Sequence, residues 1–79
     1  MASNILPLSF LEAGQDAVIR DFNGGQSLRQ RLVDMGFVRG NNVRVVKNEM
    51  GGPLIISNGD GRLAIGRGIA LKIMVEKGS

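Results

Sequence analysis

The 79-residue sequence contains neither cysteine nor histidine, and this absence excludes whole classes of chemistry. Without cysteine the chain cannot form a disulfide or a thiolate metal site. The usual pairs of catalytic nucleophile and base are missing too, and the seven carboxylates are scattered singly along the chain. We therefore expect a protein that is not an enzyme, with no catalytic residue and no cofactor. We also expect no dedicated iron site, because ferrous iron normally needs imidazole, thiolate or clustered carboxylate ligands.

Aromatic side chains are scarce as well: the chain has no tryptophan or tyrosine and only Phe10, Phe22 and Phe37. A groove for proline-rich peptides and a base-stacking platform for nucleic acid both need an aromatic lining. The net charge of +3 is too small to indicate nucleic-acid binding. We therefore expect the three phenylalanines in the core and no nucleic acid among the partners. A basic barrel that binds nucleic acid stays open as a third class, which a strong salt dependence would reveal.

Long apolar runs are also lacking. No stretch approaches the roughly 18 residues of a membrane-spanning helix, and residues 1–11 lack the positive region of a signal peptide. We expect a cytoplasmic protein with no direct membrane insertion, so that any role at a membrane depends on a partner. The length indicates a single domain over residues 1–79.

The clearest pattern that is present predicts a short helix. Leu28, Leu32 and Met35 recur at i, i+4 and i+7, which places them on one helix face. Just upstream, Ser27 and Gln30 have the form of a capping box, which would satisfy free backbone donors at the start of the helix. Gly36 follows the last apolar residue of the face, where a left-handed helix end prefers glycine.

The remaining patterns predict strands and turns. Five short strands are expected near residues 16–22, 42–47, 54–57, 62–65 and 73–75. Residues 1–5 are expected to be a frayed start, and Pro7 is expected to open a short helical turn. The run Asn58–Gly61 predicts a hairpin, because Asn-Gly and Asp-Gly supply positive φ. One further helical turn is expected over residues 69–72.

Several motifs in order carry a resemblance. They are Leu-Arg-x-Arg-Leu-x-Asp-Met-Gly-Phe-x-x-Gly at 28–40, Met-Gly-Gly-Pro-Leu at 50–54, Leu-Ala-Ile-Gly-Arg-Gly at 63–68 and Ala-x-Lys-Ile-x-Val at 70–75. This set resembles the FeoA family, small cytoplasmic proteins of bacterial ferrous-iron transport, and the resemblance covers residues 8–75.

The resemblance implies a mainly β fold, a small SH3-like five-stranded barrel with one short α-helix and a core of about residues 8–75. It also implies an accessory or regulatory protein of ferrous-iron uptake that binds the FeoB transporter at its cytoplasmic G-protein domain. The alternative is an SH3-like interaction domain of iron-dependent transcriptional regulation. The residues alone indicate only a non-catalytic interaction module.

Two arginines are candidate partner-binding residues. Arg29 and Arg31 are expected in the first turns of the helix and Asp34 near its end, which is the unfavourable order for the helix dipole. A residue that opposes local stability is a candidate for another role. An ion pair between Arg31 and Asp34 at i+3 is the alternative explanation.

A second candidate region is the loop of Met50, Gly51, Gly52, Pro53 and Leu54. Methionine and leucine beside flexible glycines form an adaptable apolar contact surface. The alternative is a plain hairpin loop whose ends pack on the core. A third motif, Asn23-Gly24-Gly25 before the helix, is interpreted as a turn rather than a cradle for an anion, since the rest of a phosphate-binding motif is missing.

Overall fold

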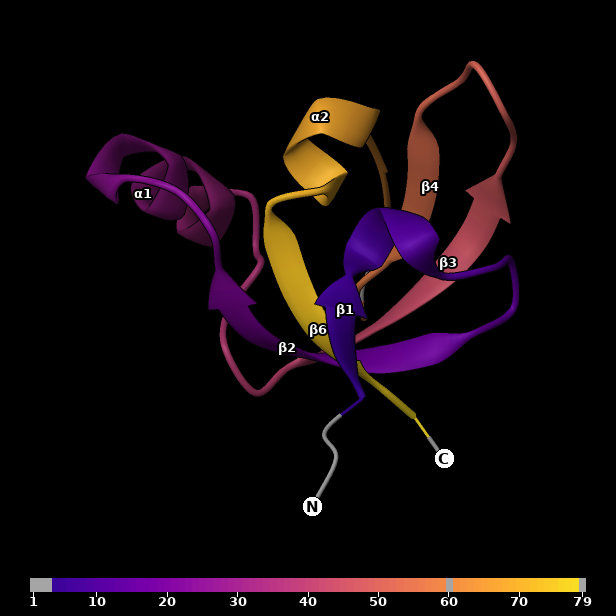
Figure 1. The fold of residues 1–79 in the computed structure, drawn as a ribbon, viewed down its shortest axis with the longest axis horizontal. Coiled ribbons are helices and arrows are strands. Elements are labelled where there is room, and N and C mark those ends of the chain that lie inside the picture. The colour runs from indigo at the N-terminus through magenta and orange to yellow at the C-terminus, as the bar shows by residue number, and fades with distance from the viewer. Residues whose placement is uncertain (1–3, 60, 79) are drawn as a thin grey trace.

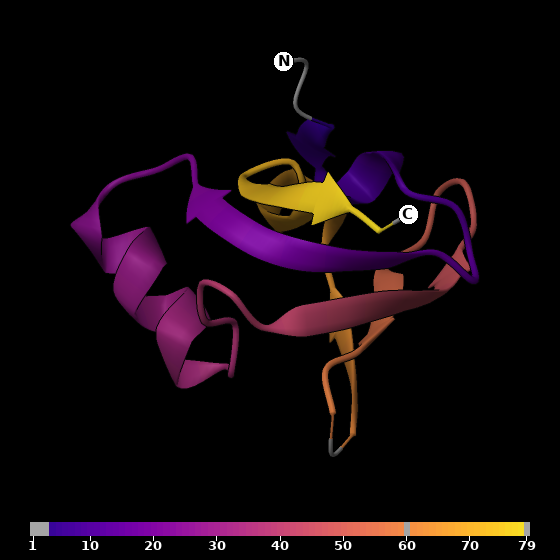
Figure 2. The ribbon, with the colours of Figure 1, turned by 90° about the horizontal axis from the view of Figure 1, so that it is seen from below.

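The protein consists of one antiparallel sheet and short helical segments, in a computed structural model that describes residues 4–59 and 61–78 (Figure 1). The strands are β1 (Ile5–Pro7), β2 (Asp16–Phe22), β3 (Asn42–Asn48), β4 (Leu54–Ser57), β5 (Arg62–Ile65) and β6 (Ile73–Lys77). The helical segments are η1 (Leu8–Phe10), α1 (Gln26–Asp34) and α2 (Arg67–Ala70). Figure 2 shows the β4–β5 hairpin projecting from the rest of the sheet.

The sheet has six strands in the order β1-β6-β2-β3-β4-β5, so the expected five-stranded barrel is not confirmed. Among the described residues the pairing leaves β1 and β5 as the two edges, and the sheet is not closed. The extra strand is β1, which begins at Ile5, the last residue of the expected frayed start, whereas residues 1–3 lie outside the described part of the chain. Ile5 lies opposite Glu76 and Pro7 opposite Met74, so β1 is held by a strand about 70 residues away in the chain. A three-residue strand of this kind has no local sequence signal.

The other strands lie close to their expected positions. The bounds of β2, β4 and β5 are as predicted, β3 extends one residue further, and β6 extends two. Their inward positions alternate, as in β4, where Leu54 and Ile56 are buried. Together with residues from the helical segments they form one core: Leu8, Leu11, Ala17, Ile19, Phe22, Leu32, Phe37, Val43, Val45, Leu54, Ile56, Ile65, Ala70, Ile73 and Val75.

Helix α1 presents the predicted apolar face to this core. Leu32 is fully buried, and Leu28 and Met35 pack against the core while partly exposed. The predicted capping box is wrong, because the N-cap is Gly25 and no side chain caps the helix. Helix α1 begins earlier than its apolar periodicity indicates, so Ser27 already lies inside the first turn.

The end of α1 follows the prediction closely. Gly36 has φ +98°, a conformation that glycine adopts without strain. Its N–H donates to the Val33 carbonyl at 2.9 Å, and the Phe37 N–H donates to the Leu32 carbonyl at 2.9 Å. These two bonds form a Schellman motif, and the buried pair Leu32 and Phe37 supplies its usual apolar contact. Gly36 thereby turns the chain from the helix back into the core.

The remaining local predictions have mixed outcomes. Pro7 caps a helical turn as expected, but α2 begins two residues earlier than the expected turn at 69–72. The hairpin after β4 is confirmed by Gly59 at φ +110°, although Asp60 lies outside the described residues. Phe22 and Phe37 are buried as predicted, whereas the prediction for Phe10 is wrong, since it is 64% exposed. In the short η1 turn the inward positions belong to Leu8 and the following Leu11.

Candidate functional site

The candidate arginine Arg29 is tethered locally. Its Nη1 lies 3.6 Å from Asp21 Oδ1, and its Nε donates to the Gly24 carbonyl at 3.3 Å. The pKa of Asp21 is lowered, first by the Phe22 backbone N–H, which donates to Oδ1 at 2.8 Å, and then by Arg39. Arg29 therefore stabilises the loop between β2 and α1, and folding alone accounts for its contacts.

The second candidate arginine, Arg31, does not form the ion pair with Asp34 that was the alternative explanation for it. Asp34 Oδ1 instead accepts a hydrogen bond from Gln30 Nε2 at 3.0 Å. Arg31 lies in the last turn of α1, where a cation is favourable to the helix dipole, so the expected conflict with the dipole is wrong for this residue. Its side chain is exposed, and within residues 4–59 and 61–78 it forms no ion pair.

The candidate loop between β3 and β4 divides into exposed and buried parts. Met50 is 99% exposed, Pro53 is exposed, and Gly51 turns the chain at φ +84°. Gly52 is half-buried. Leu54 is completely buried as the first residue of β4, so its expected place on a contact surface is wrong.

The two candidate regions do not meet. Figures 1 and 2 both show α1 at one end of the molecule and the β3–β4 loop at the opposite end. The helix arginines and the loop therefore do not form a single continuous surface.

A hydrogen-bond network that the sequence did not reveal lies next to the β3–β4 loop. The side-chain amide of Asn48 donates to the Ser9 carbonyl at 3.1 Å and to the Leu11 carbonyl at 2.6 Å. Arg67 Nη2 donates to Asn48 Oδ1 at 2.6 Å and also to the Glu49 carbonyl. The network joins η1, the end of β3 and the start of α2, and it fixes the orientation of the Arg67 guanidinium.

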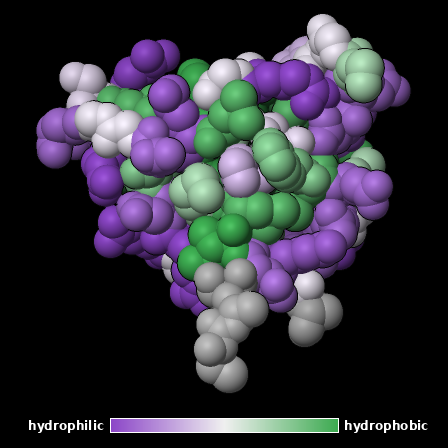
Figure 3. Space-filling view, in the orientation of Figure 1, coloured by the Kyte–Doolittle hydropathy of each residue, from purple (hydrophilic) through white to green (hydrophobic). Residues whose placement is uncertain are grey.

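Exposed apolar side chains accompany this network. Phe10 lies between the two residues whose carbonyls bind Asn48, and Met50 follows the residue whose carbonyl binds Arg67. Figure 3, which has the orientation of Figure 1, shows apolar surface in the middle of the face toward the viewer, over β1, η1 and α2. We call Phe10, Met50 and Arg67 the Arg67 cluster.

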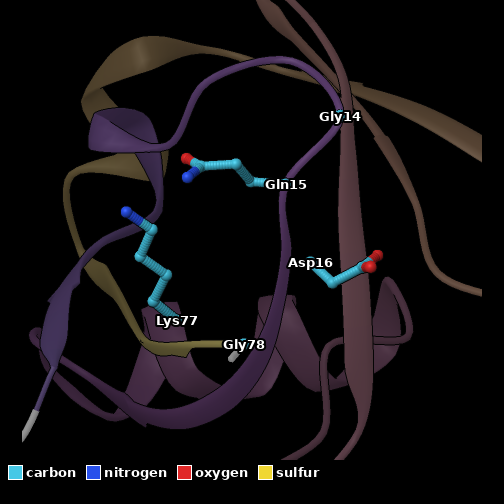
Figure 4. Close-up of a pocket in the computed structure, with 5 residues that line it drawn as sticks. All are labelled: Gly14, Gln15, Asp16, Lys77 and Gly78. Atoms are coloured by element: carbon cyan, nitrogen blue, oxygen red, sulfur yellow. The ribbon is translucent and has the colours of Figure 1, made fainter.

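A shallow pocket of about 210 Å³ lies elsewhere, between the start of β2 and the end of β6 (Figure 4). The Gln15 and Lys77 side chains face it, whereas Asp16 points away. Gln15 Oε1 already accepts the Glu12 N–H at 2.8 Å. Asp16 accepts two hydrogen bonds from Arg44 at 2.7 and 3.0 Å, which lower the pKa of the carboxyl. Gln15 and Asp16 at this pocket thus serve the structure, and they do not converge with Lys77 on a ligand.

The described residues offer neither a metal-binding cluster nor a membrane-spanning helix. Within residues 4–59 and 61–78 there is no group of three histidine, cysteine, aspartate or glutamate side chains that would hold a metal ion. No helix in this part of the chain has the length and apolar character needed to cross a membrane. The expected lack of a dedicated iron site stays a prediction, to be measured by binding.

Comparisons with known proteins give a consistent picture. The FeoA domain family model matches residues 6–77. A protein of Methanocaldococcus jannaschii provisionally named Fe(2+) transport protein A is 43% identical over 70 residues, or 89% of this chain and 84% of the relative. A crystal structure of an iron uptake regulatory protein (FeoA) is 40% identical with a TM-score of 0.84, over 92% of this chain and 96% of the other. A manganese-dependent transcriptional repressor has a TM-score of 0.84 over 98% of this chain and 44% of its own, but at 14% identity it shows a shared fold alone.

Proposed function

The chain belongs to the FeoA domain family, and from this premise we propose that it is a cytoplasmic accessory protein of ferrous-iron uptake. Its partner in this proposal is the cytoplasmic G-protein domain of a FeoB-type membrane transporter. The observation that carries the proposal is the family match over residues 6–77, since it spans nearly the whole chain. The relative named Fe(2+) transport protein A supports the same pathway.

The side chains of this protein favour a role in binding a partner over a role in catalysis. With no cysteine, histidine or tyrosine, its carboxylates and lysines would have to carry any acid–base chemistry. The shifted carboxyl groups, Asp16 and Asp21, have their pKa lowered by arginines and a backbone N–H, as in structural ion pairs. In this proposal the chain acts through its surface, and Met50 and Pro53 of the β3–β4 loop are exposed for contact.

The experiment is a titration of the purified transporter domain with this chain, in the absence of nucleotide and with GDP or a GTP analogue. The expected result is saturable binding of about micromolar affinity, which is typical of a small transient contact and equals roughly −8 kcal/mol. Absence of binding in all three states would overturn direct contact with the G-protein domain.

A second candidate is an SH3-like interaction domain of iron-dependent transcriptional regulation. The observation that favours it is the shared fold with the manganese-dependent transcriptional repressor. The same titration against a metal-dependent repressor from the same genome separates the two functions. Binding to the repressor alone would favour the second candidate.

A further inference from the structure

The Arg67 cluster differs from the rest of the surface because its cation is held in place without a carboxylate. Arg20, Arg29, Arg39 and Arg44 each lie within 4 Å of an aspartate or glutamate oxygen. Arg67 has no such partner among the residues that the structure describes, and its Nη2 binds two neutral acceptors, Asn48 Oδ1 and the Glu49 carbonyl. The guanidinium is therefore oriented by the protein while its charge stays uncompensated.

Two exposed apolar residues are sequence neighbours of the residues that hold this guanidinium: Phe10 lies between Ser9 and Leu11, and Met50 follows Glu49. Phe10 is 64% exposed and Met50 is 99% exposed, the highest fractions among the large apolar residues described. The core does not need Phe10, since Leu8 and Leu11 fill the inward positions around it, and the exposed Met50 side chain lies outside the core. Aromatic residues, methionine and arginine are the side chains that protein interfaces favour at their centres.

We infer that the Arg67 cluster is the docking surface for a partner segment in which apolar side chains flank a carboxylate. This inference rests on the proposed function and specifies the surface by which the chain meets the transporter. The two hydrogens of Arg67 Nη2 are taken by Asn48 Oδ1 and the Glu49 carbonyl, so a carboxylate of the partner would accept a charge-assisted hydrogen bond from Nη1 or Nε. The apolar side chains would exclude water from that pair. In Figure 1, α1 lies at one end of the molecule, whereas α2 and η1 lie in its middle and the β3–β4 loop at the other end. The cluster is therefore a surface separate from the helix arginines, and it replaces them as the main contact.

Charge complementarity favours this partner segment over two alternatives, a second copy of the chain and an anionic membrane. A second copy of the chain would bring Arg67 toward Arg67 in a two-fold dimer, and the copies each carry a net charge of +3. An anionic membrane attracts clusters of several flexible cations rather than one held guanidinium. A protein segment with a carboxylate between apolar residues matches the cluster in charge and in hydrophobicity.

The experiment compares variants of the full chain in the titration against the transporter's cytoplasmic domain. Phe10→Ser is expected to weaken binding at least about tenfold, as for a central interface residue. Arg67→Gln is expected to weaken it by a similar factor and to flatten the salt dependence of the association rate. Matched controls are Val33→Ser on α1 and Arg62→Gln on β5, which remove an exposed apolar side chain and an exposed arginine outside the cluster. Both controls should stay within about twofold of the unaltered chain.

The possible results separate the two proposals. If the unaltered chain does not bind, the proposed function fails and the partner named here fails with it. If it binds and both cluster variants behave like the controls, only the docking surface is overturned. Because Arg67→Gln also removes bonds to Asn48 and Glu49, melting temperatures are measured for all variants, and Phe10→Ser leaves that network intact. Binding of the chain to phosphatidylserine vesicles that is lost in both cluster variants, with transporter binding unchanged, would also overturn the inference.

Discussion

Replacing Gly36 with alanine should lower the free energy of unfolding by about 1–2 kcal/mol, because φ +98° forces an L-residue into a left-handed conformation. The added Cβ would also lie 3.0 Å from Asn58 Nδ2, which must then move. For a domain of this size, such a loss corresponds to a decrease in melting temperature of about 4–16 °C. Gly36→Val should lower the free energy of unfolding further, because β-branched residues very rarely adopt positive φ.

Thermal unfolding followed by circular dichroism is the assay, with two matched glycine controls. Gly14→Ala at φ +93° has nothing within 4 Å of the new Cβ, so it reports the backbone strain without the contact to Asn58. Gly68→Ala lies in α2 at an ordinary φ with open space around it, and its melting temperature should stay the same or rise. If Gly36→Ala melts at the temperature of the unaltered chain, the reasoning about the helix end is refuted.

Three further predictions concern the core, acid stability and iron. Leu54→Ala should lower the free energy of unfolding by about 2–5 kcal/mol, because the Leu54 side chain is completely buried. Met50→Ser should leave the melting temperature nearly unchanged, because the Met50 side chain is exposed. Equal effects of the two variants in thermal unfolding would contradict the division of the loop into a buried and an exposed part. Arg44 lowers the pKa of folded Asp16, so this ion pair favours folding at neutral pH and its contribution is lost as pH falls through and below about 4. The drop in melting temperature from neutral to acidic pH should therefore be smaller for Asp16→Asn, and an identical drop would count against the pair. Anaerobic calorimetry with ferrous iron should detect no stoichiometric site of sub-micromolar affinity, and such a site would place the protein among metal carriers.

Local sequence signals predicted most of the fold. The apolar face of α1, its end at Gly36 and the bounds of β2, β4 and β5 depend on nearby residues, so their patterns were readable. Strand β1 was missed because its partner, β6, lies about 70 residues away in the chain. The capping box failed because the helix begins at Gln26, before the first apolar residue of its face.

The candidate site was less predictable than the fold. The sequence predicted both Met50 and Leu54 as contact residues. Met50 is exposed, so that hypothesis stays open for it, whereas Leu54 is part of the core. The network of Asn48 and Arg67 joins side chains 19 positions apart and reaches carbonyls 37 and 39 positions away. No local pattern encodes such distances, so the orientation of Arg67 was visible only once the strands and α2 were assembled.

The central claim is a role in ferrous-iron uptake, and the most direct measurement is the rate of ferrous-iron uptake by cells that lack this chain. We expect this rate to differ from that of the parent cells, and a plasmid copy of the unaltered chain to restore it. A copy with Phe10→Ser should fail to restore the rate although the protein accumulates normally. Identical uptake by the deletion and parent strains at limiting ferrous iron would contradict the account.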